Sequence, residues 1–294
     1  MINIIFGGST KCATTSLYNY FSEHPEISIA STKEVRYFIS SEYPLKQPHF
    51  DRGQSYQSLF QEGKCYSLDA TPDYLYEYTA PQRISESCEK PFIIFILRNP
   101  IDRMRSWFNF AKQTNQLPNN ASMKEFIDSQ VSTYLGKNQA VKQYQLALEQ
   151  NDYKKYLEKY FQYFPQERVL IFDFDKIKNQ PYYVVKEICK VTGINFEYFN
   201  DYEFSIHNQT VNLKSPKVYE YYSDFCEFLR GYLNRFSRLR KVLKKIKLQV
   251  DKLLFFILAN SNASNVCDDE ERLLRVVNDR NERDWKEILD KYGR

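Results

Sequence analysis

The feature that most constrains the fold of this 294-residue chain is an uninterrupted apolar run over residues 91–97, PFIIFIL. A strand with one solvated face alternates apolar and polar residues, whereas a strand covered on both faces of a parallel sheet is apolar throughout. Seven residues suit a buried strand and fall far below the roughly 20 that span a membrane. The sequence therefore predicts a parallel sheet with a layer of structure on each face.

Other segments repeat this pattern of strand and helix. Further strands are expected over residues 2–6, 27–30, 65–70 and 168–173. Helical spacing of apolar residues is seen over 14–23, 74–87 (interrupted at Pro81), 101–112, 124–134, 139–162 and 182–191, and again from 218 to the C-terminus. Strands alternating with helices form βαβ units, so the expected fold class is α/β, a three-layer fold with a central parallel sheet.

The positive charge of the chain is concentrated in one segment. Residues 229–252 hold nine Lys or Arg and one acid, although the whole chain has a net charge of only +4. A local patch argues against a general nucleic-acid-binding protein. Because the segment is amphipathic, we consider contact with an anionic membrane surface, guidance of an acidic polysaccharide, or a solvated helix packed by its apolar stripe.

No Gly-, Ser- or Pro-rich linker divides the chain, so residues 1–294 are expected to form a single domain with a basic helical C-terminal segment at about 216–260. The six cysteines form no CxxC pair, and with three histidines they give no zinc-binding spacing, so no metal is expected. No signal peptide is visible, and the fold is expected to start at Met1. These features predict reduced thiols and a cytoplasmic location, with peripheral contact at the inner membrane face as an extension.

The first polar motif, residues 7–16 (GGSTKCATTS), joins the first predicted strand to the first predicted helix. Backbone N–H groups of such a loop, together with a helix N-terminus, form an anion site. Lys11 adds a positive charge, and the hydroxyls of residues 14–16 add donors. The loop differs from Walker A, which places Lys directly before Ser or Thr, since Lys11 precedes Thr14 by three residues. The alternative is an ordinary βα turn capped by Thr.

The second polar motif, residues 97–108 (LRNPIDRMRSWF), follows the apolar run and opens a predicted helix. Arg98 lies at the tip of the strand, and Ser106 lies on the second turn of the helix. A guanidinium with a nearby hydroxyl suits a second, separate phosphate group. Arg-Asn-Pro alone would mark only a helix start.

In order and context, about 90 residues apart, the two motifs resemble those of sulfotransferases that use 3′-phosphoadenosine 5′-phosphosulfate (PAPS). The 5′-phosphosulfate loop of that family reads G-x-x-K-x-G-T-T-S-L, and residues 8–17 read GSTKCATTSL. Its 3′-phosphate motif reads R-N-P-x-x-R-x-x-S-x-[YF], which residues 98–108 match. The resemblance covers roughly residues 2–215 and is nearest to the carbohydrate, heparan sulfate-like branch of bacterial type.

This resemblance implies a P-loop NTPase-like sulfotransferase fold that uses PAPS and releases 3′,5′-adenosine bisphosphate (PAP). It assigns cofactor binding to Ser9, Thr10, Lys11, Cys12, Ala13, Thr14, Thr15, Ser16, Arg98, Ser106 and Lys214. One departure is Ala13, where the family usually has Gly. Because Ala disfavours a positive φ, the loop is expected to use a negative φ there or to be slightly strained.

A third segment, residues 32–38 (TKEVRYF), resembles the K-E-x-x-F-F element of the carbohydrate branch, whose Glu is the catalytic base. Glu34 inherits that role by resemblance, and Lys11 inherits stabilisation of charge on the transferring group. An acceptor hydroxyl has a pKa far above 7 and needs a positioned base. The alternative is a surface ion pair of Glu34 with Lys33 and Arg36.

Residues 69–74 (DATPDY) resemble the S/T-P-x-Y element that borders the acceptor cleft in this branch. Asp69 or Asp73 would contact sugar hydroxyls or simply cap the turn, and Lys33 and His207 are further candidates for substrate binding. The predicted function is sulfuryl transfer from PAPS to an acceptor hydroxyl, with a glycan as the expected partner. The alternatives are a P-loop nucleotide kinase or NTPase, and a non-catalytic protein that binds a polyanion or a membrane surface.

Overall fold

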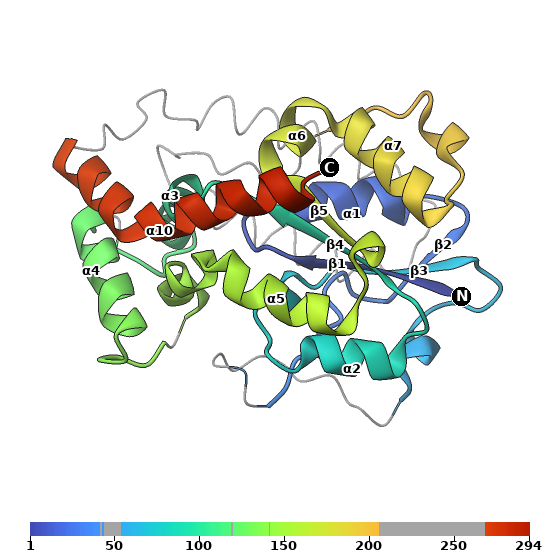
Figure 1. Cartoon of the computed structure of the whole chain (residues 1–294), viewed down its shortest axis with the longest axis horizontal. Helices are drawn as coiled ribbons and strands as arrows, with labels where there is room; N and C mark the ends of the chain where they lie inside the picture. Colours follow the sequence, from blue (N-terminus) through green and yellow to red (C-terminus); the bar gives the residue numbers. More distant parts are fainter. Residues whose placement is uncertain (42, 44–53, 119, 141, 206–267) are drawn as a thin grey trace.

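The computed structural model describes residues 1–294 except 42, 44–53, 119, 141 and 206–267 (Figure 1). Five parallel strands form one sheet in the order β2-β3-β1-β4-β5. They are β1 (Ile2–Gly8), β2 (Ile27–Ile29), β3 (Tyr66–Asp69), β4 (Phe92–Leu97) and β5 (Val169–Asp173). The predicted α/β class and parallel sheet are therefore confirmed.

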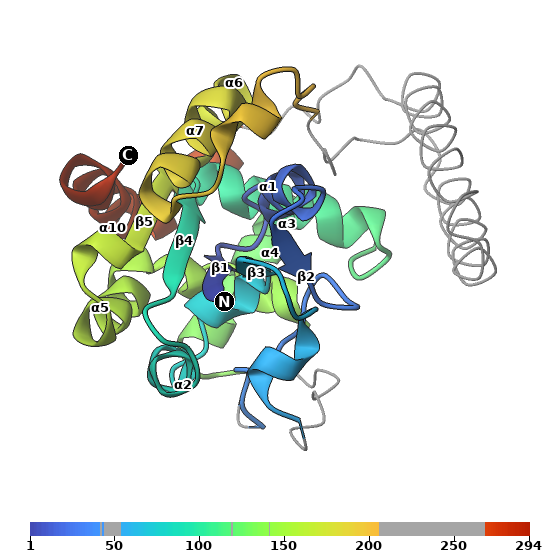
Figure 2. The ribbon, with the colours of Figure 1, turned by 90° about the vertical axis from the view of Figure 1, so that its right-hand side faces the viewer.

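Helices cover both faces of this sheet and make the outer layers (Figures 1 and 2). One face carries α1 (Thr14–Ser22), α6 (Phe174–Asn179) and α7 (Pro181–Thr192); the other carries α2 (Ala80–Ser87), α5 (Tyr153–Tyr163) and the end of α10 (Asp268–Tyr292). In β4, Ile93 and Phe95 enter the core on the α2 and α5 face, whereas Ile94 and Ile96 enter the core on the α1 and α7 face. The strand is apolar throughout because it contributes to two cores at once.

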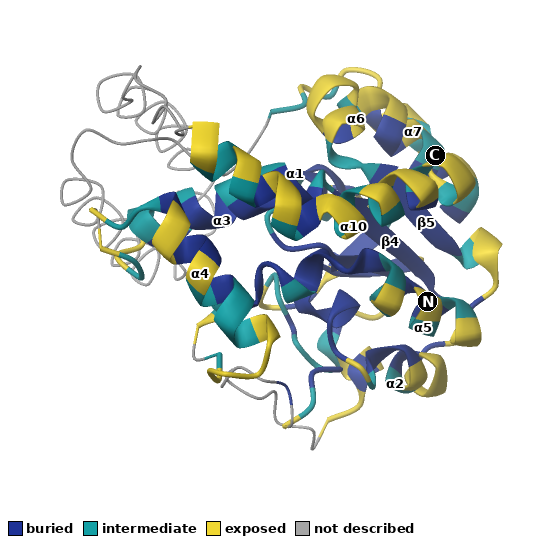
Figure 3. Cartoon of the chain, turned by 60° about the vertical axis from the view of Figure 1, so that its left-hand side comes forward, coloured by how far each residue is buried: buried dark blue, intermediate teal, exposed yellow. Residues whose placement is uncertain are grey.

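A third apolar cluster lies beyond the carboxyl ends of the strands. It joins α3 (Pro100–Gln113) and α4 (Met123–Tyr134) to α10 through Met104, Trp107, Phe126 and Leu274. From this cluster α10 runs back over the sheet, and Figure 3 shows buried strands behind its exposed outer face. Of the helices in the described part of the chain, none combines the length and apolar character that crossing a membrane requires.

The helix expected over residues 139–162 is wrong in its first half. Two 3-10 turns, η3 (Gln143–Leu146) and η4 (Glu149–Asn151), precede α5. The side chain of Asp152 accepts a hydrogen bond from the backbone N–H of Lys155 at 3.2 Å and so begins α5 anew. Gln150 and Asn151 are buried in this turn, and their side chains accept hydrogen bonds from Arg103 of α3.

Two smaller differences concern helix starts. The pattern over residues 74–87 divides into η2 (Pro72–Leu75) and α2, and Pro81 lies in the first turn of α2, where a missing N–H costs nothing. The short helix α6 was not predicted; the side chain of Asp173 accepts from the N–H of Asp175 at its start. The predicted basic segment at 216–260 lies outside the described residues.

Gly8 ends β1 at a point where no side chain fits. A Cβ added there would lie 2.7 Å from Cβ of Leu75 and 2.9 Å from the carbonyl oxygen of Pro72, and the φ of Gly8 is +154°. We predict that Gly8→Ala lowers the free energy of unfolding, measured in denaturant, by about 2–4 kcal/mol, from backbone strain and overpacking together.

Gly136→Ala is the matched control, because Gly136 has a φ of +70° and nothing within 4 Å of an added Cβ. Its expected cost is the backbone term alone, about 1–2 kcal/mol. Equal losses in the two variants would contradict the steric explanation.

Candidate functional site

The loop of residues 9–13 lies at the carboxyl end of β1, the central strand, and leads into α1. β1 is a topological switch point, because the chain continues to β3 on one side of it and to β4 on the other. Ligands of open α/β sheets bind at such points. Lys11 and Ala13 adopt left-handed backbone conformations with φ of 65° and 59°. Of the two expectations for Ala13, the negative φ is therefore wrong and the strained loop is correct. A left-handed conformation costs about 1–2 kcal/mol for each residue other than Gly.

The polar side chains at the start of this loop point into the protein. Ser9 Oγ lies 2.7 Å from Cys12 Sγ and donates to the carbonyl oxygen of Ile96 at 3.0 Å. Thr10 Oγ1 lies 3.2 Å from the hydroxyl of Tyr76, which also accepts from the Thr10 N–H. Burial raises the pKa of the Cys12 thiol. The side chains of the candidates Ser9, Thr10 and Cys12 are therefore engaged within the protein, and so are the backbone N–H groups of Ser9, which donates to the Ile96 carbonyl oxygen, and of Thr10.

Arg103, on the first turns of α3, holds this loop from the interior. Its guanidinium is fully buried and donates through Nε to the carbonyl oxygen of Thr10 at 3.0 Å, and through Nη2 to Thr10 Oγ1 at 2.8 Å and Tyr76 Oη at 2.9 Å. The other acceptors are the Ala147 carbonyl and the side chains of Gln150 and Asn151. Within the described residues all these acceptors are neutral, so a positive charge lies beside the loop without a carboxylate partner.

The ammonium of Lys11 lies against aromatic rings of α3. Its Nζ is 3.6 Å from the ring centre of Phe110 and 5.8 Å from that of Trp107. Burial, followed by the positive charge of Arg98, lowers the pKa of Lys11 to about 8. A partly desolvated cation in this position is stabilised by an anion.

Arg98 reaches the loop from the end of β4. Its Nη1 donates to the carbonyl oxygen of Lys11 at 3.3 Å, and its guanidinium lies 4.4 Å from the ring centre of Phe174. The Nε of Arg98 is buried, and no described residue accepts from it. A buried donor without an acceptor costs about 1–3 kcal/mol, which a bound anion would offset. Ser106, the predicted partner of Arg98, is buried on α3.

The N-terminus of α1 adds backbone N–H groups beside this loop. Ala13 supplies no side-chain cap, so the first-turn N–H groups have no acceptor within the helix and carry the positive end of its dipole. Thr14, Thr15 and Ser16 occupy this turn, as the sequence predicted. The structure thus brings Lys11 and Arg98 to the same uncapped helix end.

Glu34 follows β2 and forms the ion pair that the sequence left as an alternative. Arg36 Nη2 lies 2.9 Å from Oε2, and Lys33 Nζ lies 3.3 Å from Oε1. The backbone N–H of Arg36 donates to Thr71 Oγ1 at 3.1 Å, which ties this segment to the turn after β3. Because the side chain of Glu34 is still 33% exposed, the ion pair leaves the carboxylate accessible.

Asp69 and Asp73, the two aspartates of residues 69–74, have different surroundings. Asp69 is fully buried and accepts hydrogen bonds from Thr71 Oγ1 at 2.7 Å, Tyr74 Oη at 2.8 Å and Tyr56 Oη at 3.3 Å. Burial raises the pKa of Asp69 to about 6, partly offset by these hydrogen bonds. Of the two roles considered for Asp69, the structure therefore favours support of the turn over contact with a substrate.

Asp73 lies on η2 and is the nearer of the two to Glu34 in electrostatic terms. Burial, followed by the negative charge of Glu34, raises the pKa of Asp73 to about 6. Its Oδ1 accepts from the hydroxyl of Tyr43 at 3.1 Å and from Nε2 of Gln143. Neither Tyr43 nor Gln143 was a sequence candidate, because they come from distant segments with no motif of their own.

Two other candidates, Lys214 and His207, lie outside the described residues. The described residues contain no group of three His, Cys, Asp or Glu side chains placed to hold a metal ion.

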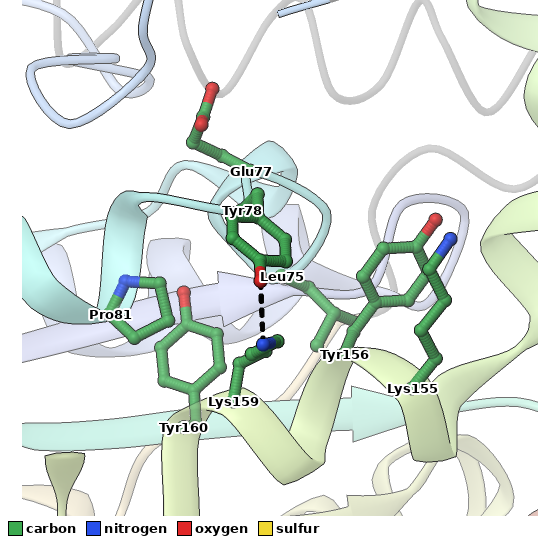
Figure 4. A pocket seen from close by; sticks show the side chains of 8 residues that line it. All are labelled: Leu75, Glu77, Tyr78, Pro81, Lys155, Tyr156, Lys159 and Tyr160. Carbon is green, nitrogen blue, oxygen red and sulfur yellow. Dashed lines mark hydrogen bonds between the residues drawn. The ribbon is translucent and has the colours of Figure 1, made fainter. Parts of the chain in front are cut away.

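A small cavity between α5 and the η2–α2 segment lies behind the loop (Figure 4). Tyr156, which lines it, packs edge-on against Tyr76 at 5.3 Å between ring centres. Lys159 Nζ donates to the hydroxyl of Tyr78 across the opening at 2.7 Å. Its volume of about 20 Å³ holds one or two water molecules and no nucleotide.

A central parallel sheet with a cationic loop at its switch point is the arrangement with which many α/β proteins bind phosphate groups. Residues 8–234 match the family described as "Sulfotransferase domain", and the chain belongs to this family.

Curated relatives agree with this assignment. The chain is 31% identical over 111 residues (38% of its length and 23% of the relative's) to "Membrane-associated sulfotransferase kil1" of Dictyostelium discoideum. It is 24% identical over 269 residues (84% of its length and 30% of the relative's) to "Bifunctional heparan sulfate N-deacetylase/N-sulfotransferase 1" of Caenorhabditis elegans. The chain thus spans about a quarter to a third of the length of these relatives.

Among solved structures, a sulfotransferase from Alicyclobacillus acidocaldarius has the same fold. The TM-score is 0.60 at 21% identity, over 81% of this chain and 95% of the other.

Titration of Lys11 tests the electrostatics of the loop. We predict that the ammonium of Lys11, followed by NMR after ¹³C-methylation of the lysines, titrates near pH 8. Arg98→Met raises the midpoint, because the second cause of the low pKa is the charge of Arg98. Lys112→Arg, on α3, is the control that identifies a neighbouring signal. An ordinary lysine midpoint in both wild type and Arg98→Met would contradict the assigned environment.

Proposed function

We propose that this chain transfers the sulfuryl group of PAPS to a hydroxyl group of a carbohydrate. The proposal is carried by one arrangement: Lys11, Arg98 and the uncapped end of α1 converge at the switch point of a sulfotransferase-family sheet. PAPS has an anionic group at its ribose 3′ position that ATP lacks, and Arg98 is the cation that the family motif assigns to it.

The residues present fit this cofactor. Loop N–H groups, Lys11 and residues 14–16 would hold the 5′-phosphosulfate. Arg98, with its buried Nε free of any described acceptor, and Ser106 would hold the 3′-phosphate. Lys214 would add a further contact, a prediction that falls outside the described residues. PAPS supplies an activated sulfuryl group, whose S–O bond to the 5′-phosphate breaks as the bond from sulfur to the acceptor oxygen forms.

The residues of the chain would then position the acceptor hydroxyl and neutralise the charge that develops during transfer. Glu34 takes the proton of the acceptor hydroxyl, because that hydroxyl is a weak nucleophile while protonated. Lys11 stabilises the charge that develops on the leaving phosphate oxygen. Such transfer depends mainly on positioning and charge stabilisation, by analogy with phosphoryl transfer.

A glycan acceptor is supported by the relatives and by the polar groups near Glu34. Several relatives are heparan sulfate N-deacetylase/N-sulfotransferases by name. Asp73, with Tyr43 and Gln143, forms a hydrogen-bonding group of the kind that binds sugar hydroxyls. Contact of residues 229–252 with an anionic membrane, and a cytoplasmic location, stay proposals from the sequence.

A nucleotide kinase or NTPase remains the second candidate to test, and a non-catalytic polyanion-binding protein the third. Lys11 stands three residues before Thr14, unlike Walker A, and the family match supports sulfuryl transfer. Calorimetric titration with PAP and, in parallel, with ATP–Mg²⁺ separates the three candidates: the sulfotransferase binds PAP, the NTPase binds ATP–Mg²⁺, and the third candidate binds neither tightly.

Removal of Arg98 tests the cofactor assignment. We predict that wild type binds PAP in isothermal titration, and that Arg98→Ala weakens binding roughly 10- to 100-fold, because charge-assisted hydrogen bonds are lost. Arg105→Ala is the matched control: Arg105 lies on α3 and pairs with Asp102 and Glu271, away from the loop. Tight binding of ATP–Mg²⁺ without binding of PAP would favour the NTPase instead.

Replacement of Glu34 tests the base. We predict that Glu34→Gln lowers kcat for transfer of ³⁵S-sulfate from PAPS to a glycan by about 10²–10⁴-fold, since general-base catalysis is lost, while PAP affinity is unchanged. Glu86→Gln, an exposed carboxylate paired with Gln82, is the control. A turnover close to wild type in Glu34→Gln would rule out this role. Parallel amino-sugar and hydroxyl-only acceptors distinguish transfer to nitrogen from transfer to oxygen.

A further inference from the structure

The helix α10 carries a fully buried polar residue, Asn278, in an otherwise charged surface helix. Its other buried residues are Leu274 and Ile288, both apolar. A buried amide costs free energy unless its donors and acceptor are satisfied. An apolar residue would serve packing alone, so the contacts of Asn278 define its role.

Asn278 bonds to the turn that precedes α5. Its Oδ1 accepts from Nδ2 of Asn151 at 2.7 Å, and its own Nδ2 donates to the carbonyl oxygen of Leu274 at 2.9 Å. Asn151 also donates through Nδ2 to the carbonyl oxygen of Pro100 at 3.0 Å. With both donors of Asn151 committed in this direction, its Oδ1 faces the opposite side.

That oxygen accepts from Nη1 of Arg103 at 2.7 Å. Arg103 in turn holds Thr10 by two hydrogen bonds, at 3.0 Å to the carbonyl oxygen and 2.8 Å to Oγ1. Asn278, Asn151 and Arg103 are each 0% exposed. A continuous buried relay, Asn278–Asn151–Arg103–Thr10, therefore connects α10 to the loop of residues 9–13.

We propose that this buried relay positions the loop, so that Asn278 is a positioning residue for the anion site. The loop needs external support because Lys11 and Ala13 are held at positive φ. The relay supplies it from α10, which begins at Asp268, beyond the family match at 8–234. The sulfotransferase region thus depends on a helix outside the matched range. The inference rests on the proposed function only in taking PAP as the ligand.

Asn278→Leu removes the relay's first hydrogen bond while keeping a side chain of similar size. In the free protein, we expect the hydrogen-bonded amides that flank the loop, those of Ser9, Thr10 and Leu17, to exchange about fivefold to tenfold faster, as the loss of one buried hydrogen bond predicts. PAP binding should weaken by a similar factor. Asn278→Ala is a second variant, which adds no bulk and is accommodated in a helix.

Ile288→Val is the matched control, because Ile288 is buried on the same helix and lies outside the relay. It should lower Tm without changing exchange of the amides of Ser9, Thr10 and Leu17. The proposal is overturned if both Asn278 variants lower Tm as Ile288→Val does and leave exchange of these amides at the wild-type rate. Exchange is measured without PAP, so this outcome is independent of whether the proposed function fails.

Discussion

The buried guanidinium of Arg103 is the interaction on which the rest of the site depends. It connects four segments that are far apart in the sequence: α3, the loop after β1, the segment around Tyr76 and the turns before α5. Burying a charge is costly unless hydrogen bonds replace its hydration, and here neutral oxygens do so. With no carboxylate among its described partners, its charge is not cancelled locally and adds to the positive potential at the loop.

The strands and the fold class followed from the sequence because they are local patterns, and Lys11 and Arg98 could be named as candidates for binding an anion for the same reason. Each of these features can be recognised from a few consecutive residues. Examples are the apolar run at 91–97, Lys11 close to the hydroxyls of residues 14–16, and Arg98 at a strand end. The role of Arg103 and the break before Asp152 did not follow, because they depend on contacts of Arg103 with Thr10 and Asn151, each more than 40 residues away in the chain. The burial of Asp69 did not follow either, because the sequence around it suits a capped turn and a substrate contact equally. Strand order was likewise beyond local pattern.

On the acceptor side, two carboxylates with unlike surroundings lie close together. Glu34 is balanced by the charges of Lys33 and Arg36 and stays accessible, whereas Asp73 is buried and its pKa is raised by burial and by Glu34. Protonation of Asp73 near pH 6 would relieve the repulsion between the two carboxylates.

The end of α10 also has a consequence for association. β5 is an edge strand, and exposed edges offer backbone groups to strands of other molecules. Gly293 forms a parallel bridge with Ile171, and the N–H of Arg294 donates to the Ile171 carbonyl oxygen at 3.0 Å. The middle of that edge is therefore already occupied by the chain itself. Sheet extension into a continuous intermolecular sheet is blocked on this side, which leaves β2 as the edge where a tag or fusion partner needs the most care.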